Sequence, residues 1–306
     1  MQASELFNQP NTILLDGGMG TMLQAAGMKL GTRPEDLNIE NPELIRSIHA
    51  KYAAAGSRVV NANTFGASPH KLADSKYTLE EVITAGIANC KQAVAPYGAL
   101  VTLDVGPLGE LLEPSGTLAF EDAVAEYGRI VRAGVAAGAD ILYFETFTDL
   151  YEMKAALLAA KENSTLPIMA SMSFEANGRT FTGCTVESFA ATARGLGANA
   201  VGINCSLGPK EIFPMAKRLA EAVPGDFPVF VKPNAGLPRA DGSGYDITPQ
   251  LYAMQMKPYR ELHLFAAGGC CGTTPEFIQM LNGVFADCKP GRPEHPMLSV
   301  LCSPVD

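Results

Sequence analysis

Short runs of apolar, β-prone residues recur along the chain, and stretches with helical spacing separate them. The runs are Ile13–Leu15, Val59–Ala62, Leu100–Leu103, Ile141–Phe144, Pro167–Met172, Ala200–Ile203, Pro228–Val231 and Leu262–Ala266. They are continuous rather than alternating, which is typical of strands buried on both faces. Their spacing of roughly 30 to 45 residues matches a repeated βα unit. The pattern therefore predicts eight strands with helical connections.

The connecting segments carry apolar residues on one helical face. One face comprises Leu79, Val82, Ile83, Ile87, Cys90 and Val94, and another comprises Phe120, Val124, Tyr127, Val131 and Val135. Gly56 and Gly98 mark helix ends. Pro42 and Pro275 mark helix starts. This alternation favours a single-domain α/β chain, a (β/α)₈ TIM barrel over residues 1–306. A doubly wound open sheet is the alternative, because periodicity alone does not show closure.

Two segments lie outside the alternation. Residues Ser173–Gly183 predict a hairpin inserted after the fifth strand, with its turn at Asn177-Gly178. Residues 287–306 are rich in proline, and we expect this C-terminal tail to wrap the barrel in extended form.

Polar residues and glycines follow every apolar run. They are Asp16–Gly18, Asn63–Gly66, Asp104–Pro107, Glu145–Thr146, Ser173–Phe174, Asn204–Ser206, Pro233–Gly236 and Gly268–Gly272. In a (β/α)₈ barrel the active site is built at the carboxyl ends of the strands. We therefore expect these segments to contribute to one pocket.

The composition narrows the class of protein. Among 306 residues, 47% are hydrophobic and 18% are charged, as in a globular core, and the formal net charge is −9. This charge argues against nucleic acid or an anionic membrane surface as a partner. We find neither a signal peptide nor an apolar stretch that spans a bilayer, so we expect a cytoplasmic protein with reduced thiols.

Three of the seven cysteines fall at strand ends. Cys205 follows the sixth run, and Cys270 and Cys271 follow the eighth, flanked by glycines that let both thiols turn the same way. Three thiolates with an open fourth position suit a catalytic zinc ion. Spacing alone leaves open a vicinal disulfide or simple packing. For the other four, Cys90, Cys184, Cys288 and Cys302, we expect roles as small buried hydrophobes.

Six motifs occur in order at these strand ends. They are Leu14–Thr21 (LLDGGMGT), Asn61–Ser68 (NANTFGAS), Phe144–Thr146 (FET), Gly202–Ser206 (GINCS), Pro233–Pro238 (PNAGLP) and Gly268–Pro275 (GGCCGTTP). Together they resemble the homocysteine S-methyltransferase family. Asp104–Leu111 (DVGPLGEL) and PNAGLP look closest to the homocysteine-binding module of cobalamin-dependent methionine synthase.

The resemblance implies a zinc-dependent methyltransferase that makes methionine. One zinc ion per chain would be held by Cys205, Cys270 and Cys271, and homocysteine would enter as its thiolate. Three cysteinates and one substrate thiolate would give the site a net charge of about −2, which keeps the sulfur nucleophilic. Asn234 ends the strand between these cysteines, so its amide oxygen is a candidate fourth ligand before substrate arrives. Alternatively, Asn234 only holds the PNAG turn.

The resemblance also assigns the amino-acid part of the substrate. It places the ammonium group beside Glu145 and Asp16. Independently of the resemblance, the backbone amides of Gly17 and Gly18 and the Thr64 hydroxyl are the donors that these strand ends offer to the substrate carboxylate. Alternatively, Asp16 caps the following helix. Glu145 is harder to explain otherwise, because a carboxylate ending an apolar strand would be buried unpaired. Asp104, in a similar position, is expected to support the rim loop.

The motifs do not identify the methyl donor. The chain ends at Asp306 without the folate, corrinoid and reactivation modules of cobalamin-dependent methionine synthase. We therefore expect the methyl group to arrive on a separate corrinoid protein, with no corrinoid bound by this chain. The alternative is a small free donor, S-methylmethionine or betaine. Such a donor calls for an aromatic cage, and only Phe65, Tyr143, Phe144 and Phe174 lie near strand ends.

Two hypotheses of other classes remain. In one, the GGCCGTT segment of a different barrel enzyme cradles phosphate, although no lysine or arginine accompanies it. In the other, the chain is a non-catalytic zinc-binding subunit that docks a partner.

Overall fold

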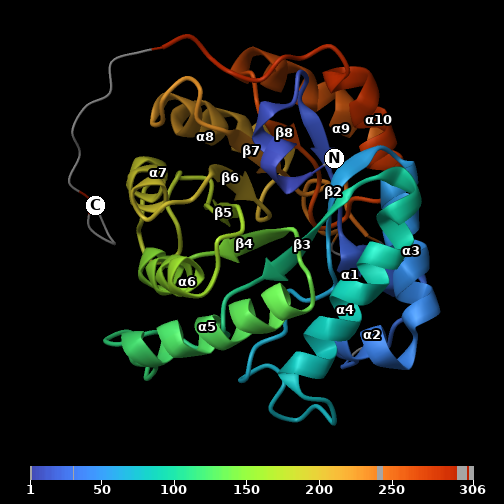
Figure 1. Cartoon of the computed structure of the whole chain (residues 1–306). Helices are drawn as coiled ribbons and strands as arrows, with labels where there is room; N and C mark the ends of the chain where they lie inside the picture. The colour runs from blue at the N-terminus through green and yellow to red at the C-terminus, as the bar shows by residue number, and fades with distance from the viewer. Residues whose placement is uncertain (1, 30, 240–243, 295–301, 303–306) are drawn as a thin grey trace.

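Eight parallel strands close into a barrel with helices around it (Figure 1). The computed structural model describes residues 2–29, 31–239, 244–294 and 302. Each strand pairs with its sequence neighbours, and β1 pairs with β8 through Ile13 and Ala266. This closure confirms the (β/α)₈ barrel and rules out the open sheet.

The strands confirm most of the predicted runs. They are β1 (Ile13–Leu15), β2 (Ser57–Asn61), β3 (Leu100–Val105), β4 (Ile141–Phe147), β5 (Ile168–Met172), β6 (Ala200–Asn204), β7 (Val229–Lys232) and β8 (Ala266–Ala267). The last run was placed wrongly, since the predicted Leu262–Ala266 overlaps β8 only at Ala266. The residues before it form a 3₁₀-helix, Lys257–Leu262, which ends at His263 in a left-handed conformation (φ 46°). Leu262, Leu264 and Phe265 of this run are buried ahead of β8, where the Phe265 N–H donates to the Val229 carbonyl at 2.8 Å.

Ten α-helices are present in the described part of the chain. They are α1 (Met19–Ala25), α2 (Leu37–Glu40), α3 (Pro42–Ala54), α4 (Leu79–Val94), α5 (Phe120–Ala136), α6 (Leu150–Asn163), α7 (Val186–Gly195), α8 (Pro209–Glu221), α9 (Pro249–Met256) and α10 (Pro275–Phe285). Pro42 and Pro275 open their helices as predicted, and Gly56 and Gly98 follow helix ends with positive φ. None of these helices combines the length and the apolar character that crossing a membrane requires.

The predicted buried face is correct for α4 and partly wrong for α5. All six residues expected on the α4 face are buried. In α5, Tyr127 and Val131 are buried, but Val135 is 37% exposed. The helix instead turns Gly134 toward the sheet, where a Cβ would lie 2.4 Å from Leu103. A glycine that permits close approach is invisible to a count of apolar side chains.

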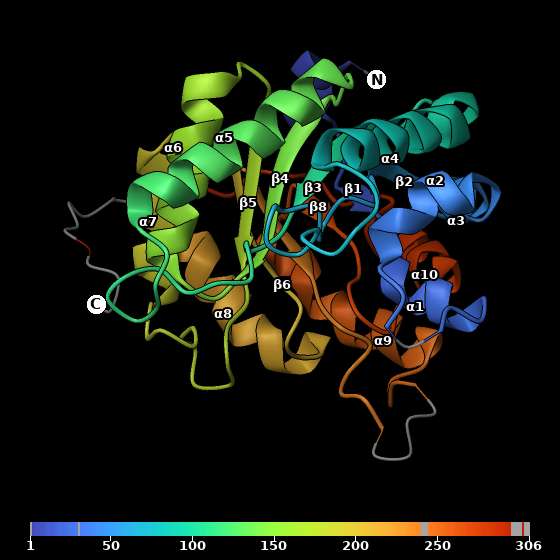
Figure 2. The same cartoon turned by 90° about the horizontal axis from the view of Figure 1, so that it is seen from below.

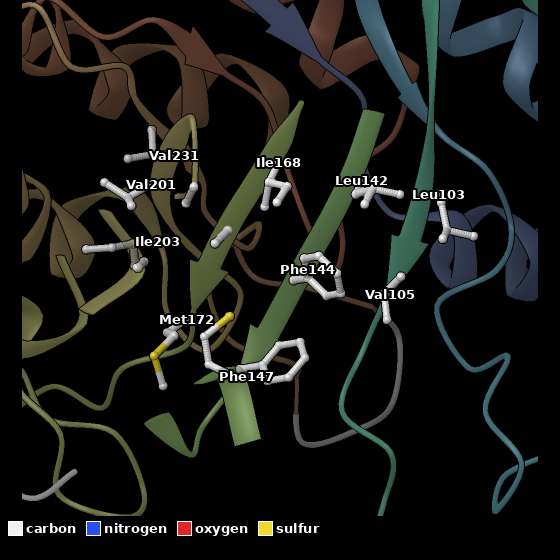
Figure 3. Packing of buried hydrophobic residues seen from close by; sticks show 14 of the residues in the cluster. Leu103, Val105, Leu142, Phe144, Phe147, Ile168, Met172, Val201, Ile203 and Val231 are labelled. Atoms are coloured by element: carbon white, nitrogen blue, oxygen red, sulfur yellow. The ribbon is translucent and has the colours of Figure 1, made fainter. Parts of the chain in front are cut away.

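The apolar core has two layers separated by the barrel wall. Leu103, Val105, Leu142, Phe144 and other residues point outward and pack under the helices (Figure 3). Inside the barrel, side chains of all eight strands form a second cluster. The N-terminal 3₁₀-helix, Ala3–Asn8, covers this cluster with fully buried Leu6. In Figure 2 the N-terminus and the loops after β4 and β5 lie at opposite ends of the barrel, which leaves the carboxyl end for the site.

The two predicted additions are partly described. The turn at Asn177-Gly178 is present, with Gly178 at φ 75° and the Glu175 N–H donating to the Arg179 carbonyl at 2.8 Å. No strand pair extends from this turn in the described residues, and the isolated bridge of the segment joins Arg179 to Thr185 instead. Arg292 donates its backbone N–H to Gly225, so the start of the tail runs across the amino end of the barrel. The prediction for 295–301 and 303–306 lies outside the described residues.

Candidate functional site

A layer of polar side chains lies above the apolar interior of the barrel. Successive residues in a strand alternate between faces, so the residue two positions after an inward apolar side chain also points inward. Tyr143 is followed in this way by Glu145, and Phe230 by Lys232. The buried polar residues at this level are Asn61, Thr102, Asp104, Glu145, Ser171, Asn204 and Lys232. Of these, Asn61, Asp104, Glu145 and Lys232 line a pocket at the carboxyl end.

Three thiols meet at one side of this pocket. The Sγ atoms of Cys205, Cys270 and Cys271 lie within 4.8 Å of one another, and those of Cys205 and Cys271 are 3.8 Å apart. Tetrahedral zinc with Zn–S bonds of about 2.3 Å requires sulfur atoms about 3.8 Å apart. The three cysteines are half-buried and unbridged. The spacing therefore fits a tetrahedral metal ion with one position left for a ligand.

Unusual backbone conformations bring the thiols together. Cys205 and Ser206 adopt left-handed φ angles of 62° and 61°, which non-glycine residues rarely do. On the other side, β8 ends at Ala267, and Gly268 fits so tightly that a Cβ would lie 2.8 Å from the Asp16 carbonyl. As predicted, the chain leaves strand geometry before the paired cysteines, so both sulfurs face Cys205.

The thiols of the cluster differ in the direction in which their pKa is shifted. Hydrogen bonds from Cys205 and then Cys270 lower the pKa of Cys271 to about 3, and the Tyr245 side chain adds to this effect. Hydrogen bonding to Cys205 and Cys271, together with burial, raises the pKa of Cys270. The lowered pKa of Cys271 favours its thiolate form, and a divalent ion would stabilise the thiolate form of all three cysteines.

A buried ion network lies next to the thiols. Lys232 Nζ is 3.0 Å from Asp16 Oδ1 and 3.6 Å from Glu145 Oε2, and its side chain is only 3% exposed. Asp16 also accepts the backbone N–H of Asn61 at 2.8 Å. Although burial opposes its charge, Asp16 and Glu145 raise the pKa of Lys232, so the ammonium stays charged. Burial raises the pKa of Glu145, and Lys232 counteracts that shift.

Two further carboxyl groups line the pocket. Asp104 is 6% exposed, and within the described residues its Oδ1 has no hydrogen-bond partner. Burial, then repulsion from Glu145, raises its pKa. Glu35 accepts the backbone N–H of Gly66 at 2.7 Å, and burial raises its pKa as well. The pocket therefore carries an excess of acceptors over cations.

The structure brings most of the predicted substrate residues together. Asp16, Gly17, Gly18 and Glu145 line the pocket with the three cysteines. Asp16 does not cap α1, whose N-cap is Gly18. Gly18 already donates its N–H to Thr273 Oγ1 (3.2 Å).

Two predicted residues stand behind the pocket wall. The Thr64 hydroxyl donates to the Asp104 carbonyl (2.8 Å) and accepts from the Asp104 N–H (3.1 Å), and Thr64 is not among the lining residues. Asn234 Oδ1 accepts the N–H of Cys271 at 3.1 Å, which favours the turn-holding alternative. Substrate binding by Thr64 and metal ligation by Asn234 stay predictions.

Sequence reasoning missed three residues. Lys232 directly follows the seventh apolar run, so the argument applied to Glu145 should have found it. Asn204 was noticed only as part of a motif, yet it contacts both Glu145 and Cys270. Tyr245 lines the pocket from the loop after β7, and a Cβ on Gly272 would collide with its ring. A residue that reaches a site from a long loop leaves no periodic signal.

The cavity measures about 350 Å³ and opens at the carboxyl end of the barrel. Phe65 and Tyr245 contribute aromatic rings, whereas Tyr143, Phe144 and Phe174 are fully buried away from it.

Fold and site together define a (β/α)₈ barrel protein with a metal-competent cysteine cluster beside an acidic, amino-acid-sized pocket. The sequence profile of the family described as Homocysteine S-methyltransferase matches residues 13–285. The chain belongs to this family.

Individual proteins with names from the same chemistry are also similar to this chain. Methionine synthase of Mycobacterium tuberculosis is 31% identical over 300 residues, which are 91% of this chain and 25% of that protein. Methionine synthase of Mycobacterium leprae is 30% identical over 90% of this chain and 24% of its own length. The chain thus spans about a quarter of these relatives. The oxidised form of the homocysteine methyltransferase MmuM from Escherichia coli superposes with a TM-score of 0.79 at 25% identity, covering 92% of this chain and 98% of that one.

The ion network yields a stability prediction. In Lys232→Met the two buried carboxylates lose their cation, which we expect to cost about 3–5 kcal/mol of unfolding free energy at pH 8. Without Lys232 the folded-state pKa of Glu145 rises further above its unfolded value. Folding then favours the protonated acid, so the deficit should shrink as pH falls from 8 to 5. Urea unfolding across this pH range measures the effect.

Lys91→Met provides the matched control. Lys91 pairs with Asp140 at 2.9 Å on the surface, so its loss should cost about 1 kcal/mol or less. If Lys232→Met is as mild as this control at pH 8, the buried pairing is not a source of stability.

Proposed function

We propose that the protein is a zinc-dependent homocysteine S-methyltransferase that forms methionine. The observation that carries this proposal is the meeting, in one pocket, of a three-thiol cluster with buried acids that suit an ammonium group. The family membership and the names of its relatives support the same chemistry. A sulfur atom at one end and an ammonium group at the other are the two ends of homocysteine.

The donor set supports zinc, one ion per chain. Three soft thiolates with tetrahedral spacing and an open position match catalytic zinc better than a hard cation. The Escherichia coli MmuM protein has also been solved in a metallated form. Zinc bound here would keep homocysteine as a thiolate at neutral pH, where a free thiol is only a few per cent ionised.

The remaining residues orient the substrate. We place the ammonium group against Asp16 and Glu145, with the unpaired Oδ1 of Asp104 as a further acceptor. The substrate carboxylate would face the amide of Gly17, at the start of the turn into α1. Lys232 stays charged between Asp16 and Glu145, because these two carboxylates raise its pKa against the effect of burial. The thiol end of the substrate would thereby be directed toward the three cysteines and their metal ion, where its thiolate would attack the methyl group in line.

For the donor we propose a methylated corrinoid on a separate protein. The strongest support is the sequence likeness of Asp104–Leu111 and Pro233–Pro238 to cobalamin-dependent methionine synthase. A cavity of about 350 Å³ is too small to enclose a corrin macrocycle, so its carrier would present the methyl group at the mouth. We propose that this chain itself binds no corrinoid.

A small cationic donor is the second candidate. Tyr245 adds an aromatic ring that the sequence did not reveal at the site, and with Phe65 and the carboxyl group of Glu35 it could contact a sulfonium or quaternary ammonium. S-Methylmethionine or betaine would then enter the same cavity.

The metal proposal predicts a selective loss in Cys271→Ala. Removing one of three thiolates should lower zinc content well below one per chain after metal-replete purification, and the residual zinc should be labile to chelators. Elemental analysis provides the measurement. Cys302→Ala removes an exposed thiol outside the cluster and should keep full zinc. Equal zinc in both variants would refute the assignment.

Glu145→Gln should weaken homocysteine binding without removing zinc. Loss of a charge-assisted bond to the ammonium group corresponds to about 1.5–3 kcal/mol, or roughly a ten- to hundredfold higher dissociation constant. Titration calorimetry with zinc-loaded protein measures it. Glu187→Gln, which affects a surface ion pair with Arg218, is the control. Normal binding in Glu145→Gln, or loss of zinc, would assign this residue another role.

The donor proposal is tested by comparing donors directly. Zinc-loaded protein with homocysteine should form methionine fastest from a methylated corrinoid protein, and more slowly from free methylcobalamin, betaine or S-methylmethionine. Product is quantified by mass spectrometry, with Cys271→Ala as the blank. Equal or faster turnover with a small donor would select the second candidate. Binding of zinc and homocysteine without turnover from any donor would favour a docking subunit.

A further inference from the structure

The side chain of Asn204 connects the thiol cluster to the ammonium-binding acids. Asn204 ends β6, precedes Cys205 and is fully buried. Its Oδ1 accepts the backbone N–H of Thr146 at 3.0 Å and the Ser171 hydroxyl at 2.8 Å. A backbone N–H can only donate, so the oxygen of the amide must face Thr146. The orientation of the amide is therefore fixed, and its nitrogen faces the opposite way.

The amide nitrogen points at both halves of the site. Nδ2 lies 3.2 Å from Glu145 Oε2 and 3.9 Å from Cys270 Sγ, and it also donates to Thr146 Oγ1 at 2.7 Å. All three neighbours are acceptors, and in the ionised site two of them carry negative charge. A neutral amide that donates to a carboxylate and to a thiolate stabilises both without adding a cation to the pocket.

The same amide holds a strained residue. Thr146 has a left-handed φ of 65°, a conformation that is strained for a β-branched residue. Both its N–H and its hydroxyl are hydrogen-bonded to Asn204. Because Thr146 directly follows Glu145, these bonds also fix the direction in which the Glu145 carboxylate leaves the strand.

We propose that Asn204 is a positioning residue that couples the two ends of the homocysteine site, by aligning the Glu145 carboxylate for the substrate ammonium group and by donating a hydrogen bond to the Cys270 sulfur. This inference rests on the proposed function, since it assumes a metal at the cysteines and an amino-acid thiol as substrate. It adds a residue that touches neither the ion nor the substrate. An N–H···S bond withdraws charge from a thiolate, so Asn204 would moderate the donor strength of Cys270.

Two variants separate the bonds. Asn204→Asp is isosteric and keeps an acceptor for Thr146 and Ser171, but it replaces the donor that faces Glu145 and Cys270. Asn204→Ser removes the amide without adding charge. Asn199→Asp is the matched control, because Asn199 Oδ1 also accepts a backbone N–H of the neighbouring segment, from Ile168 at 2.8 Å, at the far end of β6. Circular dichroism and urea midpoints identify the folded variants.

The readouts are homocysteine affinity and the spectrum of the cobalt(II)-substituted protein. We expect both Asn204 variants to bind homocysteine at least tenfold more weakly, and their thiolate-to-cobalt absorption to move to longer wavelength as the Cys270 sulfur becomes more electron-rich. The control should match the wild type within twofold and without a spectral shift. Combining Asn204→Ser with Glu145→Gln should weaken affinity little beyond Glu145→Gln alone, because both act through one carboxylate.

A measurement on the unaltered chain makes the test independent of folding of the variants. In cadmium-113-substituted protein labelled with [¹⁵N]asparagine, the Nδ2 protons of Asn204 should show scalar coupling to the metal across the N–H···S bond. Absence of this coupling, an unchanged cobalt spectrum in a folded variant, or additive effects in the double variant would each overturn the inference. A wild-type protein that binds neither cobalt nor homocysteine would instead contradict the proposed function, and the inference with it.

Discussion

The buried ammonium group of Lys232 is the interaction on which the site depends. Two carboxylates below 10% exposure, Asp16 and Glu145, converge on it inside the barrel. An isolated charge at this depth would be costly, whereas a paired cluster is tolerated. Asp16 directly follows β1, whereas Lys232 and Glu145 lie in β7 and β4, and only closure of the sheet brings these strands around one axis. The barrel thus assembles an ion network that no local segment could form.

Most strands could be predicted from the sequence because parallel strands that are buried on both faces consist of continuous apolar runs. The prediction failed where apolar residues are buried by contacts other than strand pairing or where a helix packs through a residue without a side chain. The predicted run Leu262–Ala266 is mostly apolar, yet it begins at the last residue of a 3₁₀-helix, and within this run only Ala266 belongs to β8. In α5 the helix approaches the sheet through Gly134 instead of Val135. Hydrophobicity indicates that a residue is buried, and it does not indicate which partner buries it.

The site could be predicted from the sequence where cysteines or carboxylates directly follow or end an apolar strand. The adjacent cysteines between glycines and the carboxylate ending β4 were both found in this way, and the thiol cluster meets as expected. Lys232 escaped because the search for ammonium-binding groups considered only acids. Asn204 was not predicted because its role depends on the orientation of its side-chain amide. That orientation is set by the backbone N–H of Thr146, a residue in a left-handed conformation. Sequence shows the residue types, and the network among them exists only in the closed barrel.

The electrostatics of the pocket imply how an amino-acid thiol would be distinguished from a simple one. Asp16 and Glu145 share a single lysine, and within the described residues the buried Oδ1 of Asp104 has no partner. A thiol without an ammonium group would cover these acceptors and leave them unsatisfied. Sites built to hydrogen-bond a substrate reject analogues that lack the matching group far more strongly than apolar pockets reject a missing methylene. Selectivity would therefore be set at the barrel floor, while the thiol cluster would provide reactivity toward any sulfur that reaches it.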